Sequence, residues 1–134
     1  MREILFRGKR IDNGEWVEGF LLKECNYVTC SWNLGIEYKT DKFGKFAYDV
    51  AEVDAETIGQ YTGKTDKNGT KIFEGDIIRG FMDYGPAGYL ERVVCIYWND
   101  ECGYQWNYFL LDTIEVIGNK HDNPELLRSD NDAE

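Results

Sequence analysis

The stretch TIGQYTGKTDKNGTKIFEGDII, Thr57–Ile78, decides which fold class this sequence predicts. Thr57–Tyr61 favours a strand. Gly63–Gly69 is a polar loop ending in Asn68-Gly69, a pair typical of tight turns because both residues accept positive φ values. Short apolar pairs lie on either side of Gly75-Asp76, which predicts a bulge or tight bend between two short strands. The stretch is therefore expected to be β-structure folded back on itself.

The residues before this stretch extend the β pattern. Asp12-Asn13-Gly14 is a strong hairpin turn between the alternating segment Ile4–Phe6 and a return strand over Trp16–Leu22. Asp54 is placed to cap one helical turn that ends at Thr57. Three more strands are predicted over Asn26–Trp32, Ile36–Lys39 and Lys45–Val50.

The residues after it continue in the same way. Leu90–Trp98 has apolar residues at both even and odd positions, which predicts a strand covered on both faces. Asn99–Gly103 is a turn that leads to a hairpin partner over Gln105–Leu111, and Thr113–Ile117 favours a last strand. Asn123–Leu127 begins with an N-cap and a proline, which indicates a short helical turn. With no sustained helical periodicity, the chain is predicted to be mostly β.

Composition limits the classes of function. The chain has 134 residues, 43% of them hydrophobic and 30% charged, which is typical of a globular domain. Its net charge of −10 disfavours binding to phosphate backbones, so nucleic acid is an unexpected partner. The one weak basic patch consists of Lys64, Lys67, Lys71 and Arg79.

Compartment and metal chemistry follow from sequence patterns. No apolar stretch approaches the length of a membrane span, and the first ten residues lack a signal-peptide core, so a cytoplasmic protein is expected. The four cysteines are Cys25, Cys30, Cys95 and Cys102, and His121 is the only histidine. Their spacings do not match a zinc knuckle, so we expect no metal site and no disulfide.

Catalytic patterns are incomplete. Gly63-Lys64-Thr65 resembles the end of a phosphate-binding loop, but the required first glycine is replaced by Ile58 and no helix is predicted to follow. A calcium loop starting at Asp66 would place Ile77 where a glutamate is needed. The carboxylates Asp76, Asp100, Glu101 and Asp112 show no convergent spacing. The sequence therefore predicts neither an enzyme nor a cofactor.

An aromatic set lies in the C-terminal third: Tyr97, Trp98, Tyr104, Trp106, Tyr108 and Phe109. Exposed aromatic residues are enriched at interfaces. Packing in a small core is the favoured interpretation, because large apolar patches are uncommon on monomers.

The stretch Thr57–Ile78 closely resembles the signature of the YopX family of phage and prophage proteins. That signature runs approximately TxGQYTGxxDKNGxxIxEGDI. Arg2–Arg7, Ile114–Asn119 and Asn123–Leu127 resemble the ends of the family, so the resemblance brackets nearly the whole chain. It implies an SH3-type small barrel in the C-terminal part and a setting in temperate phages. It implies no catalytic residue, cofactor or substrate.

This gives a three-part prediction: an N-terminal antiparallel β region over residues 1–56, the SH3-type barrel over residues 57–118, and a helical turn with an acidic disordered tail over residues 119–134. The motif residues are interpreted as structural: Gly59, Gly63, Asp66, Asn68, Gly69, Glu74, Gly75 and Asp76.

The leading hypothesis for function is a non-catalytic phage accessory protein that binds protein or associates with itself. Edge strands of small barrels favour such pairing, and the strands from Ile4 and from Leu90 are apolar enough for it. Two alternatives stay open: a nucleic-acid-binding barrel that uses the basic patch, and an acidic decoy of a basic host protein.

Overall fold

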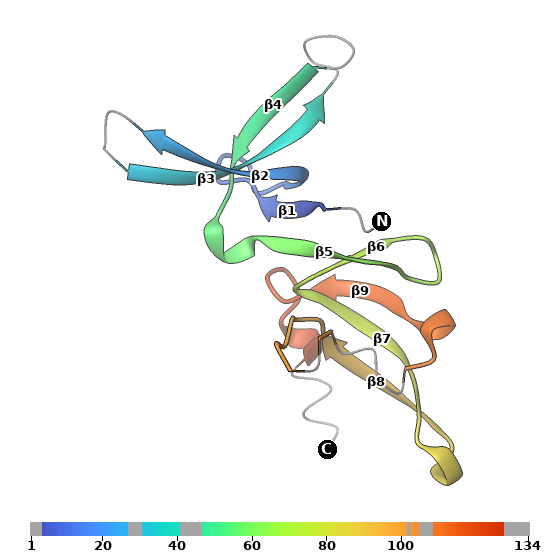
Figure 1. Ribbon diagram of the computed structural model, residues 1–134. Coiled ribbons are helices and arrows are strands. Elements are labelled where there is room, and N and C mark those ends of the chain that lie inside the picture. Colours follow the sequence, from blue (N-terminus) through green and yellow to red (C-terminus); the bar gives the residue numbers. More distant parts are fainter. Residues whose placement is uncertain (1–3, 27–30, 41–46, 102, 105–108, 128–134) are drawn as a thin grey trace. The chain divides into compact units, whose positions relative to one another are not determined.

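The computed structural model describes residues 4–26, 31–40, 47–101, 103–104 and 109–127 (Figure 1). Strands account for 57% of the structure, so the mostly-β prediction is confirmed. The other elements are three 3₁₀ turns and the predicted C-terminal helical turn at 125–127. The chain divides into two compact units, residues 1–61 and 62–134.

The first unit is an antiparallel sheet in the order β4-β3-β2-β1-β5. These strands are β1 (Phe6–Lys9), β2 (Trp16–Asn26), β3 (Ser31–Thr40), β4 (Ala47–Glu52) and the start of β5 (Gly59–Thr65), which crosses into the second unit.

The predicted turn between β1 and β2 is confirmed. Gly14 has a φ of 73°, its N–H donates to the carbonyl of Arg10 at 3.0 Å, and the N–H of Arg10 donates to Glu15 at 2.8 Å. The predicted strand over Asn26–Trp32 falls largely outside the described residues; its first residue ends β2 and its last two begin β3.

The core of the first unit lies on one face of this sheet. Ile36 on β3 is fully buried and pairs with Leu21 on one side and Ala51 on the other. Gly19 on β2 belongs to the same face, where a Cβ atom would overlap the carbonyl oxygen of Glu37. Glycine at this position therefore lets β2 and β3 approach closely.

The end of β4 folds back onto the end of β1. Val53 forms a bridge with Arg10, and the N–H of Ile11 donates to the carbonyl of Glu52 at 3.0 Å. The 3₁₀ turn η1 (Ala55–Thr57) follows, capped as predicted by Asp54, whose side chain accepts from Glu56.

The second unit contains the end of β5, its neighbour β6 (Lys71–Phe73), and a separate antiparallel sheet in the order β8-β7-β9. These three strands are β7 (Asp76–Asp83), β8 (Tyr89–Cys95) and β9 (Glu115–Asn119). The structure is not a closed barrel, so of the predicted SH3-type small barrel only the mostly-β class is confirmed. In the part of the chain that is described, β6 neighbours β5 and not β8, so the three-stranded sheet does not close on itself.

The core of the second unit gathers on one face of that sheet. Its members are Ile72, Ile78, Ile96, Tyr104, Phe109 and Ile114. Gly80 on β7 leaves room for Phe109 and Ile114, since a Cβ atom there would lie 3.1 Å from the Phe109 ring.

Two predictions about the region around β8 have different outcomes. The turn at Asn99–Gly103 is confirmed by reciprocal hydrogen bonds of 3.1 and 2.7 Å between Asn99 and Gly103. Its expected partner strand over Gln105–Leu111 falls largely outside the described residues. The prediction that Leu90–Trp98 is covered on both faces is wrong. The first three residues of β8 are exposed, and Leu90 and Trp98 are each 52% exposed.

Candidate functional site

Asp66 is the centre of the signature stretch. Its carboxylate accepts from the backbone N–H groups of Asn68 and Thr70 through Oδ1, and from that of Val116 through Oδ2, each at 2.9 Å. Burial by itself raises the pKa of Asp66, but these three hydrogen bonds, with a smaller contribution from Lys67, hold it below its ordinary value. Asp66 therefore fastens the turn over residues 66–70 to β9.

Asp76 and Glu74 fix the second bend of the stretch. Asp76 is 1% exposed, and its Oδ2 accepts from the N–H of Phe73 at 2.7 Å, which closes the turn between β6 and β7. Gly75 sits inside this turn with a φ of 92°. Glu74 accepts from the hydroxyl of Tyr104 at 3.0 Å. This is the tight bend expected from the sequence.

The remaining motif residues lie in the backbone of the same segment. Gly59 is buried at the start of β5, Gly63 lies within that strand with a φ of 90°, and Asn68-Gly69 forms the turn, with a φ of 82° at Gly69. The geometry gives them roles in turns and in packing.

The basic patch is partly neutralised. The carboxylate of Glu115 on β9 forms ion pairs with both Lys67, at 3.5 Å, and Arg79, at 3.2 Å. Lys64 is exposed on β5 and Lys71 is half-buried on β6. Two of the four predicted cations therefore share one carboxylate.

The family model for YopX protein matches residues 5–128, nearly the whole chain. The chain belongs to the YopX family. No curated protein matches this YopX chain.

A solved structure similar to this YopX chain is the crystal structure of protein EF1440 from Enterococcus faecalis. The two chains are 23% identical, the TM-score is 0.52, and the match covers 95% of this chain and 99% of the other. At this identity the likeness concerns the fold alone.

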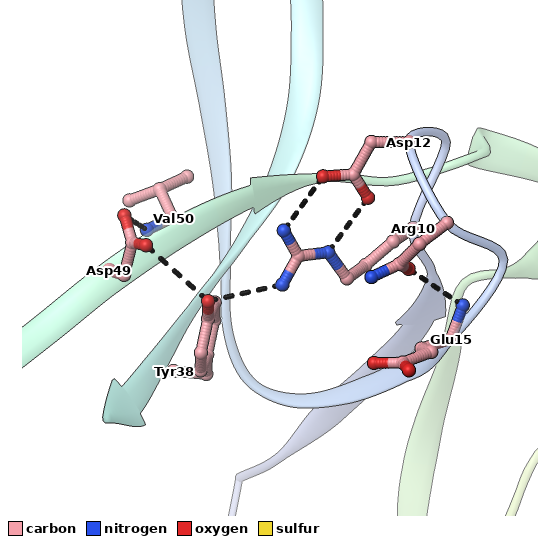
Figure 2. A network of polar contacts seen from close by, with 7 residues as sticks. Arg10, Asp12, Glu15, Tyr38, Asp49 and Val50 are labelled. Carbon is pink, nitrogen blue, oxygen red and sulfur yellow. Dashed lines mark hydrogen bonds and ion pairs between the residues drawn. The ribbon is translucent and has the colours of Figure 1, made fainter. Parts of the chain in front are cut away.

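The first unit of the YopX chain contains a polar network that the sequence analysis missed (Figure 2). Arg10 donates twice to Asp12, at 2.9 and 2.8 Å, and once to the hydroxyl of Tyr38, at 3.1 Å. The Tyr38 hydroxyl in turn donates to Asp49 at 3.4 Å. The hydrogen bonds with Asp12 raise the pKa of Arg10 above its ordinary value and lower that of Asp12. The network joins the β1–β2 turn to β3 and β4.

Beside this network lies an open groove of about 520 Å³. It is lined by Arg7, Trp16, Val17, Glu18, Tyr38 and Lys39. The Arg7 guanidinium lies 4.8 Å from the centroid of the Trp16 ring, and the Lys9 ammonium lies 5.9 Å from it. The Asn-Gly turn could have indicated this arrangement, because it sets the register that pairs Lys9 with Trp16 and Arg7 with Glu18.

The edges of the second unit's sheet differ. On β9 the N–H of Val116 donates to the Asp66 carboxylate, and just before β9 the carbonyl of Ile114 accepts from the N–H of Lys67 at 2.9 Å. β8 has β7 as its one strand neighbour among the described residues, and its first residues, Tyr89 and Leu90, are 62% and 52% exposed.

In the first unit, β1 is paired on both sides, with β2 and with β5. The expectation that the strand from Ile4 could pair with another chain is therefore wrong for β1. The expectation made for the strand from Leu90 stays a prediction.

The predicted aromatic set is divided by the structure. Tyr104 and Phe109 are core residues, and Tyr104 packs edge-on against Trp98 with ring centroids 5.1 Å apart. Tyr97 and Trp98 are more than half exposed. Trp106 and Tyr108 lie outside the described residues.

Of the four cysteines, only Cys95 has a described side chain, and it is half-buried on β8. Within the described ranges, no group of three or more histidine, cysteine or acidic side chains is arranged to hold a metal ion. Across the same ranges, no helix has the length and hydrophobicity needed to cross a bilayer.

Proposed function

We propose that this YopX protein is a non-catalytic phage accessory protein that acts by binding protein, and that its second unit pairs with another copy through the edge of β8. The observation that carries the proposal is the hydrogen bonding of this strand to β7 alone among the described strands. An exposed edge strand is a template for adding another strand.

The chemistry of β8 favours a second copy as the partner. The charged residues of β8 are Glu91 and Arg92, one of each sign, so this edge is neutral in a chain of net charge −10. Tyr89 and Leu90 add exposed apolar area next to the strand's backbone groups. A neutral, partly apolar edge can meet its own copy without the repulsion that the rest of the chain would cause.

The edge at β4 is less suitable for the same purpose. Its two charged residues, Asp49 and Glu52, are both acidic, so two copies would repel each other there. The carbonyl of Glu52 already accepts from Ile11. Charged and covered edges are common ways in which proteins prevent strand addition.

The nucleic-acid alternative is weakened by the basic patch itself. Lys67 and Arg79 both pair with Glu115, and each phosphate contact needs a cation that can replace the released counterions. A mixed-sequence DNA duplex should therefore not shift in a gel at physiological salt.

Light scattering on the purified protein at micromolar concentration tests the proposal. The wild type should have a mass above the 15.6 kDa of one chain. Leu90→Lys and Tyr89→Lys should each lower the mass to that of a monomer, because a lysine on an edge strand opposes pairing. Ile11→Lys is the matched control, because Ile11 is 60% exposed on the β1–β2 turn, and it should behave like the wild type.

Three results would contradict pairing through β8. A wild type of 15.6 kDa at every concentration would remove self-association. A mass that falls equally in Leu90→Lys and in Ile11→Lys would remove β8 as the surface. A wild-type monomer that shifts the duplex would make the nucleic-acid alternative the better account.

A further inference from the structure

We propose that the second unit binds a basic, amphipathic protein segment on the outer face of its three-stranded sheet, the face that points away from the core. The proposal does not depend on the pairing of β8, because it concerns side chains on the face of the sheet and not the backbone groups at its edge. It adds a partner of different chemistry to the second copy proposed for β8.

Strand alternation defines this outer face. Ile78 belongs to the core of the second unit and Met82 packs against that core, so the even-numbered residues of β7 point inward over this stretch. Phe81 lies between them and therefore points outward. Glu91 stands directly opposite Phe81 in the β7–β8 register, so the two side chains share the outer face.

The outer face is exposed at the far end of the β7–β8 hairpin. β9 pairs with β7 only as far as Arg79, and the hairpin continues beyond it to the pair formed by Asp83 and Tyr89 (Figure 1). At the covered end of this face Ile77 is fully buried, whereas Phe81 is 41% and Tyr89 62% exposed. Phe81 and Tyr89 are diagonal neighbours in the register, at a separation that aromatic side chains can span.

The turn η3 (Leu111–Thr113) lies beside Phe81 and enlarges the apolar area. The carbonyl of Phe81 accepts from the N–H of Leu110 at 2.9 Å, and the N–H of Phe81 donates to the hydroxyl of Thr113 at 3.0 Å. Leu111 in this turn is 50% exposed. Exposed large apolar side chains that gather in one place are typical of interaction surfaces.

Acidic side chains border these apolar residues. Asp83, Glu91 and Asp112 are exposed, and none of them forms an ion pair within the part of the chain that the structure describes. Arg79, the cation on the same face, already pairs with Glu115. An apolar centre with carboxylates at its border is complementary to a segment that carries apolar side chains between lysines or arginines.

The charge of this face disfavours the other kinds of partner. A second copy would present the same carboxylates and would be repelled. Phosphate backbones and anionic lipid surfaces would be repelled in the same way. The occupant that fits both the apolar centre and its border is therefore a basic segment of another protein.

Binding of short peptides to the full chain, followed by NMR, tests the proposal. The probe is the capped peptide Lys-Lys-Leu-Leu-Lys-Lys. One control replaces its leucines with serine and keeps the charge, and the other replaces its lysines with glutamate and keeps the leucines. The leucine–lysine peptide should shift the amide signals of Phe81 and Glu91 at concentrations about tenfold lower than either control, because apolar and charged contacts act together.

Substitutions separate this face from general attraction of cations to an acidic chain. Glu91→Gln should weaken binding of the leucine–lysine peptide about threefold, because it removes one charge from the border. Glu101→Gln is the matched control, an exposed glutamate in the turn after β8, and should change nothing. Phe81→Ser should weaken binding about tenfold or more, because it removes the aromatic centre. Its control is Ile11→Ser, which removes an equally exposed type of side chain from the β1–β2 turn.

Four results would overturn the inference. They are no shift with any peptide, equal binding of the leucine–lysine peptide and either control, equal effects of Glu91→Gln and Glu101→Gln, and shifts confined to residues outside the outer face. Circular dichroism shows whether Phe81→Ser is folded, and the comparison of the three peptides on the wild type does not need that variant. A wild type that is monomeric by light scattering but binds the peptide at Phe81 would remove the pairing of β8 and support this inference.

Discussion

At the scale of single residues, Asp66 joins two segments that are 50 positions apart, the turn over residues 66–70 and β9. Its carboxylate accepts hydrogen bonds from three backbone N–H groups, and these bonds favour the charged form of the carboxyl group. The sequence predicted the turn and its structural role. It did not reveal the bond to Val116, because no local pattern records a contact made across such a separation.

Asp66→Asn should lower the free energy of unfolding by about 2 kcal/mol at neutral pH, because an amide cannot accept from all three donors as a carboxylate does. Urea denaturation measures this loss. Asp112→Asn, at an exposed position, is the control and should have little effect.

The same carboxylate should make stability depend on pH. Because folding lowers the pKa of Asp66, its contribution is fully present above the unfolded value of about 3.9 and is lost as the pH falls through the lower, folded value. Urea denaturation at a series of acidic pH values should show a steeper loss in the wild type than in Asp66→Asn. Identical slopes would contradict this role.

At the scale of elements, turns with their own chemistry could be predicted and the pairing of distant strands could not. Asn13-Gly14, the Asp54 cap and the Gly75-Asp76 bend depend on neighbouring residues, and each was found as expected. The prediction of a barrel did not hold because a barrel depends on which strand β6 joins. Long-range packing decides that pairing, and β6 joins β5.

Gly19→Ala tests the close approach of β2 and β3. The new methyl group would overlap the carbonyl of Glu37, so the free energy of unfolding should fall by about 2 kcal/mol or more. Gly69→Asn is the control. Gly69 has open space around it and a left-handed φ that asparagine tolerates, so its cost should stay under about 1 kcal/mol. Thermal unfolding of both variants measures these losses. Equal losses of stability in the two variants would show that β2 and β3 do not approach so closely.

At the scale of the whole molecule, the proposed self-association depends on how each sheet edge is protected. β4 has two acidic residues, and the carbonyl of its last residue, Glu52, accepts from Ile11 in the β1–β2 turn. β9 is covered by the turn over residues 66–70, through the hydrogen bond from Val116 to Asp66. β8 has neither protection among the described residues. The sequence offered the strands from Ile4 and from Leu90 as edges for pairing, and the strand order removes the first, because β1 is paired on both sides. The groove beside Trp16 also emerged only from register, since Arg7, Glu18 and Tyr38 are far apart in sequence.

Amide hydrogen exchange at several protein concentrations tests the pairing of β8 most directly. If β8 adds to β8 of a second copy, amides over Tyr89–Cys95 should exchange more slowly as concentration rises through the micromolar range, because pairing buries their outward N–H groups. Amides of β4 should exchange at the same rate throughout. Exchange at β8 that is independent of concentration, or protection that rises at β4 instead, would contradict the account.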